Sequence, residues 1–315
     1  MSFNLPDKIV VKVTLPSDDK GLIGRVCPKC KKNFKVKPET GLKGHNLPCH
    51  CPYCGHVSDH GDFRTKEQAE YIRSVGLRHV REMFHNELKK LEFDHPPSGP
   101  FGIGFSLEVK PHSPTPIRYY YEKNLETDVV CDRCTLVYAI YGEFAFCPDC
   151  GSHNSITILK KNVEFVEKML ALAEQQERAL AEQLVGDALE NLVSAFDGFG
   201  REVCKVASPK AAKPTEACDI RFQNLIGAQN RIQKLFSLDL SSFASPDDWN
   251  FVCQSFQKRH LLAHRLGVVD ADYIQATKDN SAVVGRKILI APSDVKRLGN
   301  LLAQIGVQLT KHLLG

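Results

Sequence analysis

The second half of the chain carries hydrophobic residues at helical spacing. Apolar positions three and four residues apart over 163–196 predict one long helix of about 35 residues, ending near Gly198 and Gly200. Residues 200–218 lack this periodicity and predict a loop. The apolar spacing returns near 219–237, which predicts a second helix.

Strong start signals mark two further helices. Ser245 is placed to cap a helix whose first turn holds Pro246 and two aspartates, and Gly267 follows its expected end. The stretch 273–290 is less regular and predicts a hairpin. Ser293 is expected to cap the final helix. Four helices around one hydrophobic core are the economical arrangement for this half.

The first half is less periodic. Residues 8–15 have the composition of a strand, and residues 63–93 predict a helix. The apolar stripe expected on this helix comprises Ile72, Val75, Val80, Met83, Phe84, Leu88 and Leu91. Proline and glycine end this pattern, and residues 101–127 predict short strands and loop.

Paired cysteines give the first half its clearest chemistry. Four C-x-x-C hooks occur in two pairs, and each hook can bring two thiolates to one tetrahedral metal. The hooks of the second pair are twelve residues apart and those of the first pair twenty. The predicted ligands are Cys27, Cys30, Cys51 and Cys54 for one site, and Cys131, Cys134, Cys147 and Cys150 for the other.

Each hook pair predicts a zinc ribbon with one structural zinc ion. Four cysteine ligands leave no open coordination position, so the metal is expected to stabilise the fold and not to catalyse a reaction. The ligand set of the first ribbon has alternatives, since Cys49, His50, His45 and His56 lie nearby. We favour the set in which both hooks share the form C-P-x-C.

Composition places the chain among ordinary globular proteins. It has 315 residues, of which 43% are hydrophobic and 25% charged. No apolar run is long enough to span a membrane, and the first residues lack the layout of a signal peptide. We therefore expect a cytoplasmic protein without a membrane partner, in which paired cysteines favour zinc over disulfides.

Charge is distributed unevenly. Residues 1–60 hold 10 Lys/Arg against 5 Asp/Glu, a net charge of +5, although the whole chain carries only +4. The excess in the first ribbon predicts contact with nucleic-acid phosphates through Lys29, Lys31, Lys32, Lys35 and Lys37. A solvated face of a small domain explains the same lysines equally well.

These patterns predict a multidomain α+β protein. Two small β-type zinc ribbons, at 1–62 and 128–155, are joined by a helix and short-strand connector at 63–127. An all-α helical bundle follows at 156–315.

Candidate catalytic residues cluster near the end of the helix that begins after Ser245. Arg259 and His264 are expected about 140° apart, on either side of the apolar stripe. That stripe is expected to run through Trp249, Val252, Phe256, His260 and Ala263. Arginine binds phosphate with fixed charge, and histidine moves protons near neutral pH. If two copies pack through this stripe, their Arg/His sets surround one cleft that fits a phosphodiester.

With Arg259, His260 and His264 in this order, the helical half resembles a domain of the HEPN superfamily. The resemblance implies a homodimeric endoribonuclease that needs no metal. The ribose 2′-OH attacks the adjacent phosphate, His264 assists proton transfer, Arg259 stabilises charge and His260 supports them. It further implies a toxin or phage-defence effector controlled by an antitoxin or trigger.

Other interpretations remain open. Arg78 with His85 and Arg73 with His79 match the same Arg/His pattern. The candidate residues could instead be a surface charge patch beside a semi-buried histidine, and two histidines one turn apart can bind a metal. The alternative functions are a non-catalytic nucleic-acid-binding regulator and a protein-interaction scaffold with the ribbons as docking sites.

Overall fold

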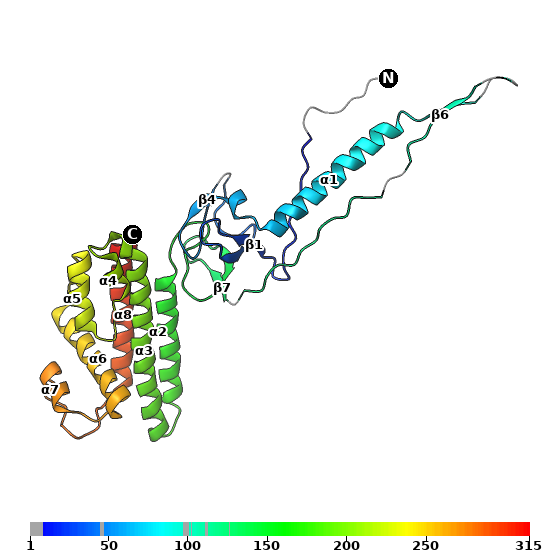
Figure 1. Ribbon diagram of the computed structural model, residues 1–315. Helices are drawn as coiled ribbons and strands as arrows, with labels where there is room; N and C mark the ends of the chain where they lie inside the picture. The colour runs from blue at the N-terminus through cyan, green and yellow to red at the C-terminus, as the bar shows by residue number, and fades with distance from the viewer. Residues whose placement is uncertain (1–8, 45–46, 97–100, 102, 111–112, 126) are drawn as a thin grey trace. The chain divides into compact units, whose positions relative to one another are not determined.

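The protein divides into two compact units. The computed structural model describes residues 9–44, 47–96, 101, 103–110, 113–125 and 127–315. Residues 1–142 together with 146–152 form the N-terminal unit, and residues 143–145 with 153–315 form the C-terminal unit. The N-terminal unit holds small antiparallel sheets and the C-terminal unit is helical, as expected (Figure 1).

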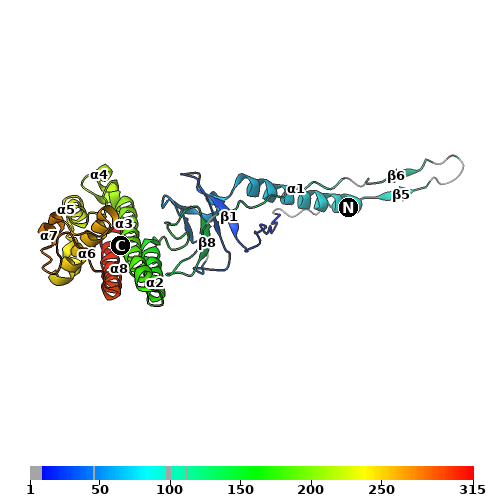
Figure 2. The ribbon, with the colours of Figure 1, turned by 90° about the horizontal axis from the view of Figure 1, so that it is seen from below.

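Both ribbons share one sheet in the N-terminal unit. Strands β1 (Ile23–Val26) and β2 (Asn33–Val36) come from the first ribbon, and β7 (Thr127–Val130) and β8 (Val137–Ile140) from the second. The antiparallel order is β1-β2-β8-β7, so β2 and β8 join the ribbons at the centre. Figure 2 labels β1 and β8, one strand of this sheet from each ribbon. The ribbons are therefore halves of one unit and not separate modules.

Aromatic residues fill the space beneath this sheet. Phe34 and Tyr138 from the central strands are almost fully buried. The rings of Phe34 and Phe63 pack edge to face, with their centroids 5.7 Å apart. Phe63 closes the short helix η1 (His60–Phe63), which follows the hairpin of β3 (Pro48–His50) and β4 (Val57–Asp59).

The strand predicted at residues 8–15 is wrong for its described part. Residues 9–15 alternate between half-buried and exposed positions but belong to no strand, and Lys8 lies outside the described residues. A β-strand needs hydrogen bonds to a neighbouring strand, so alternating burial alone does not make this segment a strand.

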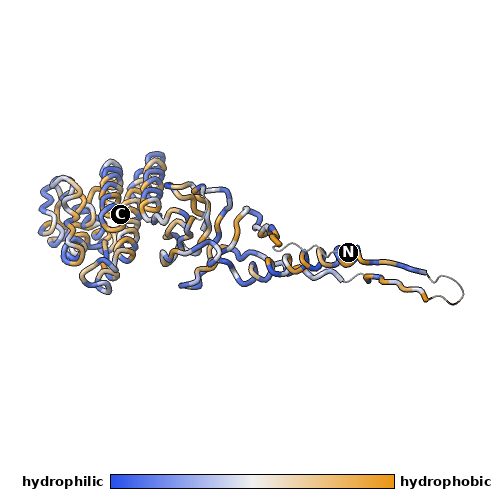
Figure 3. The backbone as a smooth tube through the Cα atoms, turned by 90° about the horizontal axis from the view of Figure 1, so that it is seen from above, coloured by the Kyte–Doolittle hydropathy of each residue, from blue (hydrophilic) through white to orange (hydrophobic). Residues whose placement is uncertain are grey.

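A helical arm extends the N-terminal unit. Helix α1 (Lys66–Lys89) starts with a capping box between Thr65 and Gln68. It leads into a hairpin of β5 (Phe93–His95) and β6 (Phe105–Leu107), whose paired residues are all exposed. Both strands mix hydrophobic with polar residues (Figure 3). The predicted stripe of α1 is not a core face, because only Gln68 and Ser74 of this helix are buried.

The C-terminal unit is built on a helical hairpin. Helices α2 (Ser155–Ala173) and α3 (Arg178–Ala207) pack against each other and against α8 (Pro292–Leu314) (Figure 1). The single long helix predicted here is wrong, since the chain turns at residues 174–177. This turn contains neither glycine nor proline, so local sequence offers no breaking signal.

The expected end of this helix near Gly198 is also wrong, because α3 continues to Ala207. Gly200 lies against the buried ring of Phe222, and a Cβ at this position would come within 2.5 Å of that ring. The glycine thus permits close packing and does not end the helix. Asp197, one turn earlier, accepts hydrogen bonds from the backbone N–H groups of Phe222 and Gln223.

The remaining helices complete the bundle. The region predicted as loop at 200–218 contains the end of α3, η2 (Ser208–Lys210) and α4 (Pro214–Cys218). Helix α5 (Leu225–Phe236) follows, then η3 (Leu240–Phe243). Within the described residues, no helix is both long and apolar enough to cross a bilayer.

Helix α6 (Pro246–Arg265) starts as expected, with the Ser245 hydroxyl accepting from the N–H of Asp248. The predicted hairpin at 273–290 is wrong: α7 (Ala271–Thr277) and one isolated bridge between Val268 and Lys287 occupy this region. The cap of α8 is Ala291, so Ser293 lies inside the first turn.

Candidate metal centres and the Arg/His cluster

All four C-x-x-C hooks adopt one backbone conformation. The residue after each second cysteine lies in the left-handed region, with φ between 60° and 66°. Its N–H donates to the carbonyl of the first cysteine of the hook at 2.9–3.0 Å. These residues are Lys31, Gly55, Thr135 and Gly151. Lys31 and Thr135 adopt this conformation at a cost of about 1–2 kcal/mol each. The same turn repeated four times, twice at that cost, indicates a shared structural requirement.

The hooks bring their cysteines together in two groups of four. In each group, ligand atoms lie within 4.8 Å of one another. The Sγ atoms of Cys30 and Cys51 are 3.6 Å apart, and those of Cys134 and Cys147 are 3.4 Å apart. Thiolates 2.3 Å from a tetrahedral zinc would be about 3.8 Å apart. The two groups therefore have the dimensions of closed Cys₄ sites.

Burial raises the pKa of two thiols in each group, which makes those thiols difficult to ionise without a cation. Desolvation raises the pKa of Cys51 and of Cys147, and it raises that of Cys134 to about 11. Burial also acts to raise the pKa of Cys131, but hydrogen bonds from Ser152 and backbone N–H groups lower it to about 7. A group of four such thiolates requires a strong local positive charge, which a divalent metal supplies.

The three alternative ligands of the first site that the structure describes lie outside its group. Cys49 is fully buried, and desolvation raises its pKa to about 12. The His50 ring contacts the carbonyl of Pro148 at 3.3 Å. His56 packs its ring near that of Phe63, and His45 lies outside the described residues.

The five lysines of the first ribbon do not form one surface. Lys29, Lys31, Lys32 and Lys37 are exposed. Lys35 is buried at 3% exposure and its ammonium pairs with the Asp18 carboxylate at 2.6 Å. Lys35 is thus a structural cation, and its predicted contact with phosphate is wrong. Phe34, Lys35 and Val36 of β2 are all buried, so both faces of this strand are covered, which a count of lysines does not reveal.

The Arg/His cluster lies in the last turns of α6. His260 and His264 are both exposed, one turn apart, with ring centroids 4.6 Å from each other. Arg259 is half-buried, and its Nε is buried without a hydrogen-bond partner among the described residues. The guanidinium makes no hydrogen bond or ion pair with either imidazole in this part of the chain.

The charges beside this cluster are already paired. The ammonium of Lys258 lies 3.9 Å from Asp294, and the guanidinium of Arg265 lies 3.5 Å from Asp270. Arg259 has no carboxylate partner among the residues that the structure describes. By contrast, Arg78 of the competing pattern on α1 pairs with Glu82 at 2.9 Å.

The expected position of His260 and Ala263 on the apolar stripe is wrong, because both are exposed. Leu261 is buried instead and packs with Val269 and Tyr273. The chain after α6 folds back over this side of the last turn. In the last turn of α6, the buried side of the helix is therefore not the side on which Trp249, Val252 and Phe256 lie.

Tyrosines around a small cavity in the N-terminal unit were missed from the sequence. The run Tyr119–Tyr121 beside Lys123 offered a compositional signal, since exposed aromatic residues next to lysine are typical of nucleic-acid-binding surfaces.

Comparison with known proteins gives no match: no family model, no curated protein and no solved structure is similar to this chain. The resemblance of the helical half to the HEPN superfamily thus rests on the Arg259, His260 and His264 pattern and the helical architecture. It stays a prediction.

Proposed function

We propose that the protein is a homodimeric endoribonuclease whose HEPN-like C-terminal unit cleaves RNA with Arg259, His260 and His264. The N-terminal unit would hold two structural zinc ions. Cys27, Cys30, Cys51 and Cys54 would bind one ion, and Cys131, Cys134, Cys147 and Cys150 the other. Zinc in such closed sites stabilises the fold and takes no part in cleavage.

The observation that carries this proposal is the unpaired guanidinium of Arg259 beside two exposed imidazoles. A buried polar group without a partner costs about 1–3 kcal/mol, so the protein is expected to gain from a ligand that satisfies it. A phosphodiester is such a ligand, since its oxygens accept charge-assisted hydrogen bonds from arginine.

The imidazoles would move the protons of the reaction. One takes the proton of the ribose 2′-OH while that oxygen forms a bond to phosphorus. The bond from phosphorus to the 5′ oxygen breaks, and an imidazolium protonates this leaving group. The products are a 2′,3′-cyclic phosphate and a 5′-OH, and Arg259 stabilises the charge on the phosphoryl oxygens. The resemblance to the HEPN superfamily further implies that a second copy of the chain completes the site.

Single substitutions test this assignment. Arg259→Ala and His264→Ala are each expected to lower the cleavage rate at least 100-fold, the range lost with a catalytic acid–base or charge-stabilising group. Arg265→Ala is the matched control, because this neighbouring arginine is paired with Asp270. Zinc content and circular dichroism establish that each variant is folded. If folded Arg259→Ala and His264→Ala cut RNA as fast as Arg265→Ala, the assignment is wrong.

The exposed arm supports a second candidate, a protein-interaction scaffold. Its hairpin exposes Phe93, Phe105 and Leu107 by 45–65%, and an isolated two-stranded hairpin is only marginally stable in water. A scaffold would neither cut RNA nor bind it. Absence of both activities in the zinc-loaded protein would favour this function.

A further inference from the structure

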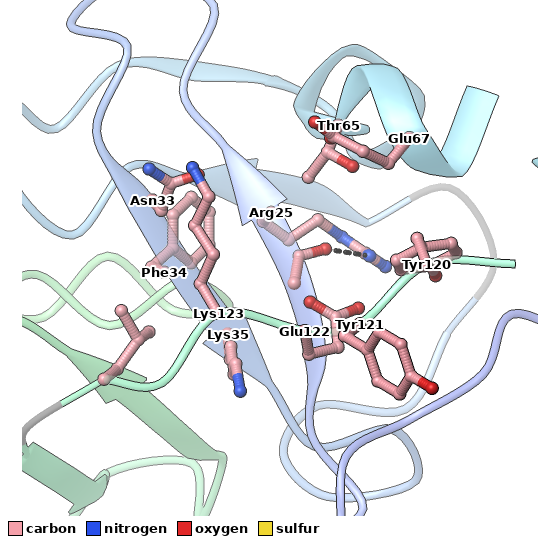
Figure 4. Close-up of a pocket in the computed structure, with 12 residues that line it drawn as sticks. Arg25, Asn33, Phe34, Lys35, Thr65, Glu67, Tyr120, Tyr121, Glu122 and Lys123 are labelled. Atoms are coloured by element: carbon pink, nitrogen blue, oxygen red, sulfur yellow. Dashed lines mark hydrogen bonds between the residues drawn. The ribbon is translucent and has the colours of Figure 1, made fainter. Parts of the chain in front are cut away.

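A small cavity in the N-terminal unit opens beside an exposed tyrosine. Its volume is about 100 Å³, and it lies between β1, β2, the first turn of α1 and residues 120–125. Arg25, Asn33, Thr65 and Glu122 contribute side chains to its wall (Figure 4). Tyr121, also part of the wall, is 99% exposed. An aromatic ring at this exposure offers its faces to a planar ligand.

Hydrogen bonds connect this cavity to two further tyrosines. The Tyr53 hydroxyl donates to the backbone carbonyl of Asn33 at 2.7 Å and accepts from the N–H of Tyr141 at 3.0 Å. The Tyr141 hydroxyl in turn donates to the carbonyl of Asn124 at 3.1 Å. Tyr53 and Tyr141 are thus bonded to each other and to Asn33, which lines the same cavity as Tyr121, although the three tyrosines come from the first ribbon, the connector and the second ribbon.

Two exposed lysines lie within this region. The Lys32 ammonium lies 5.1 Å from the centre of the Tyr53 ring, and Lys123 borders the cavity beside Tyr121. We call Tyr53, Tyr121, Tyr141, Lys32 and Lys123 the tyrosine surface. Aromatic rings alternating with cations are the chemistry that binds single-stranded nucleic acid, in which bases stack and phosphates meet lysines.

Charges inside the cavity indicate which part of a nucleotide would face it. Glu67 and Glu122 line the wall together with Arg25 and Lys35, and the Lys35 ammonium is already paired with Asp18. The same carboxylates accept hydrogen bonds from base amino groups, and the Asn33 side-chain amide offers both a donor and an acceptor. The cavity therefore fits the polar edge of a base, while the phosphates would lie over the lysines.

We propose that the tyrosine surface binds single-stranded RNA, with an unpaired base stacked on Tyr121. A duplex hides the faces of its bases and cannot make this contact. The site belongs to the N-terminal unit and is separate from the Arg/His cluster. The proposal rests on the proposed ribonuclease function in one respect: an unpaired stretch is the part of the RNA substrate that this surface would bind. RNA binding by the surface does not itself require cleavage.

Binding can be measured without cleavage. Full-length zinc-loaded protein carrying His264→Ala is titrated against fluorescein-labelled oligoadenylate and oligouridylate, singly and annealed as a duplex. In this background, Tyr121→Ala is expected to weaken single-strand binding at least fivefold, and Tyr121→Phe to change it less than twofold because the ring remains. Phe101→Ala is the matched control, since Phe101 is 98% exposed and lies outside the tyrosine surface.

Each outcome bears on the proposal. Selective loss with Tyr121→Ala and weaker binding of the duplex support it. Unchanged affinity after Tyr121→Ala, equal affinity for duplex, or no binding by the His264→Ala protein would overturn it. Binding that depends on Tyr121 in a protein whose parent never cuts RNA would refute the ribonuclease and leave the RNA surface standing.

Discussion

Val36 and Tyr138 face each other across the central pair of strands in the N-terminal sheet. Val36 belongs to the first ribbon and Tyr138 to the second, and both are buried. Each ribbon therefore provides part of the core of the other. Loss of metal from one site should disturb the shared sheet and so reach the second site.

This coupling predicts the effect of breaking one metal site. Cys134→Ser is expected to abolish zinc binding at the second group and to speed zinc release from the first, because β8 loses its support. The parent should contain about two zinc ions per chain, one for each group of four. Elemental analysis gives the content, and transfer to a colorimetric chelator gives the release rate.

Cys218→Ser is the control, since Cys218 is exposed and belongs to neither group. A Cys134→Ser protein that keeps one zinc ion with an unchanged release rate would show that the ribbons are independent.

Buried His153 predicts a pH dependence of the C-terminal unit. Desolvation lowers the pKa of His153 from 6.5 to about 4, with Lys205 adding to the effect and Glu202 opposing it. Between these values the unfolded chain binds more protons than the folded one, so the free energy of unfolding falls as pH decreases. The group contributes up to about 3 kcal/mol above pH 6.5, and this contribution is lost by about pH 4.

The measurement follows urea unfolding through Trp249, the single tryptophan, which is buried in the C-terminal unit. His153→Gln should flatten the slope of unfolding free energy against pH between 6.5 and 4, whatever its effect on stability at pH 7. An identical slope in parent and variant would contradict the role given to His153.

Two glycines of α3 should respond oppositely to alanine. A Cβ at Gly200 would meet the ring of Phe222 at 2.5 Å, so Gly200→Ala is expected to destabilise the unit by about 1–3 kcal/mol. Nothing lies within 4 Å of a Cβ at Gly198, so Gly198→Ala should stabilise the helix by about 0.5–1 kcal/mol. Urea unfolding of both variants checks this, and equal effects would contradict the packing described.

The sequence predicted most reliably the features that depend on neighbouring residues. The metal-binding hooks and the start of α6 at Ser245 are of this kind, because turn geometry and capping act within a few residues. The pairing of Val36 with Tyr138 joins positions far apart in the chain and leaves no local pattern. The turn at 174–177 and the continuation of α3 past Gly200 likewise depend on packing between helices.

The Arg/His cluster likewise has one feature that the local sequence reveals and one that depends on residues further along the chain. The order of Arg259, His260 and His264 could be read directly, but the exposure of His260 depends on how residues 267–290 fold over the last turn of α6. The burial of Lys35 against Asp18 was hidden for the same reason.

The most direct test of the ribonuclease is the chemistry of its product ends. Zinc-loaded parent protein and His264→Ala are incubated with total RNA without added divalent cations, and the fragments are mapped at both ends. Fragments ending in 2′,3′-cyclic phosphate and beginning with 5′-OH are expected with the parent, and none with the variant, if the proposed mechanism is right. Fragments with 3′-OH and 5′-phosphate ends, or the same cyclic-phosphate fragments from His264→Ala, would contradict it.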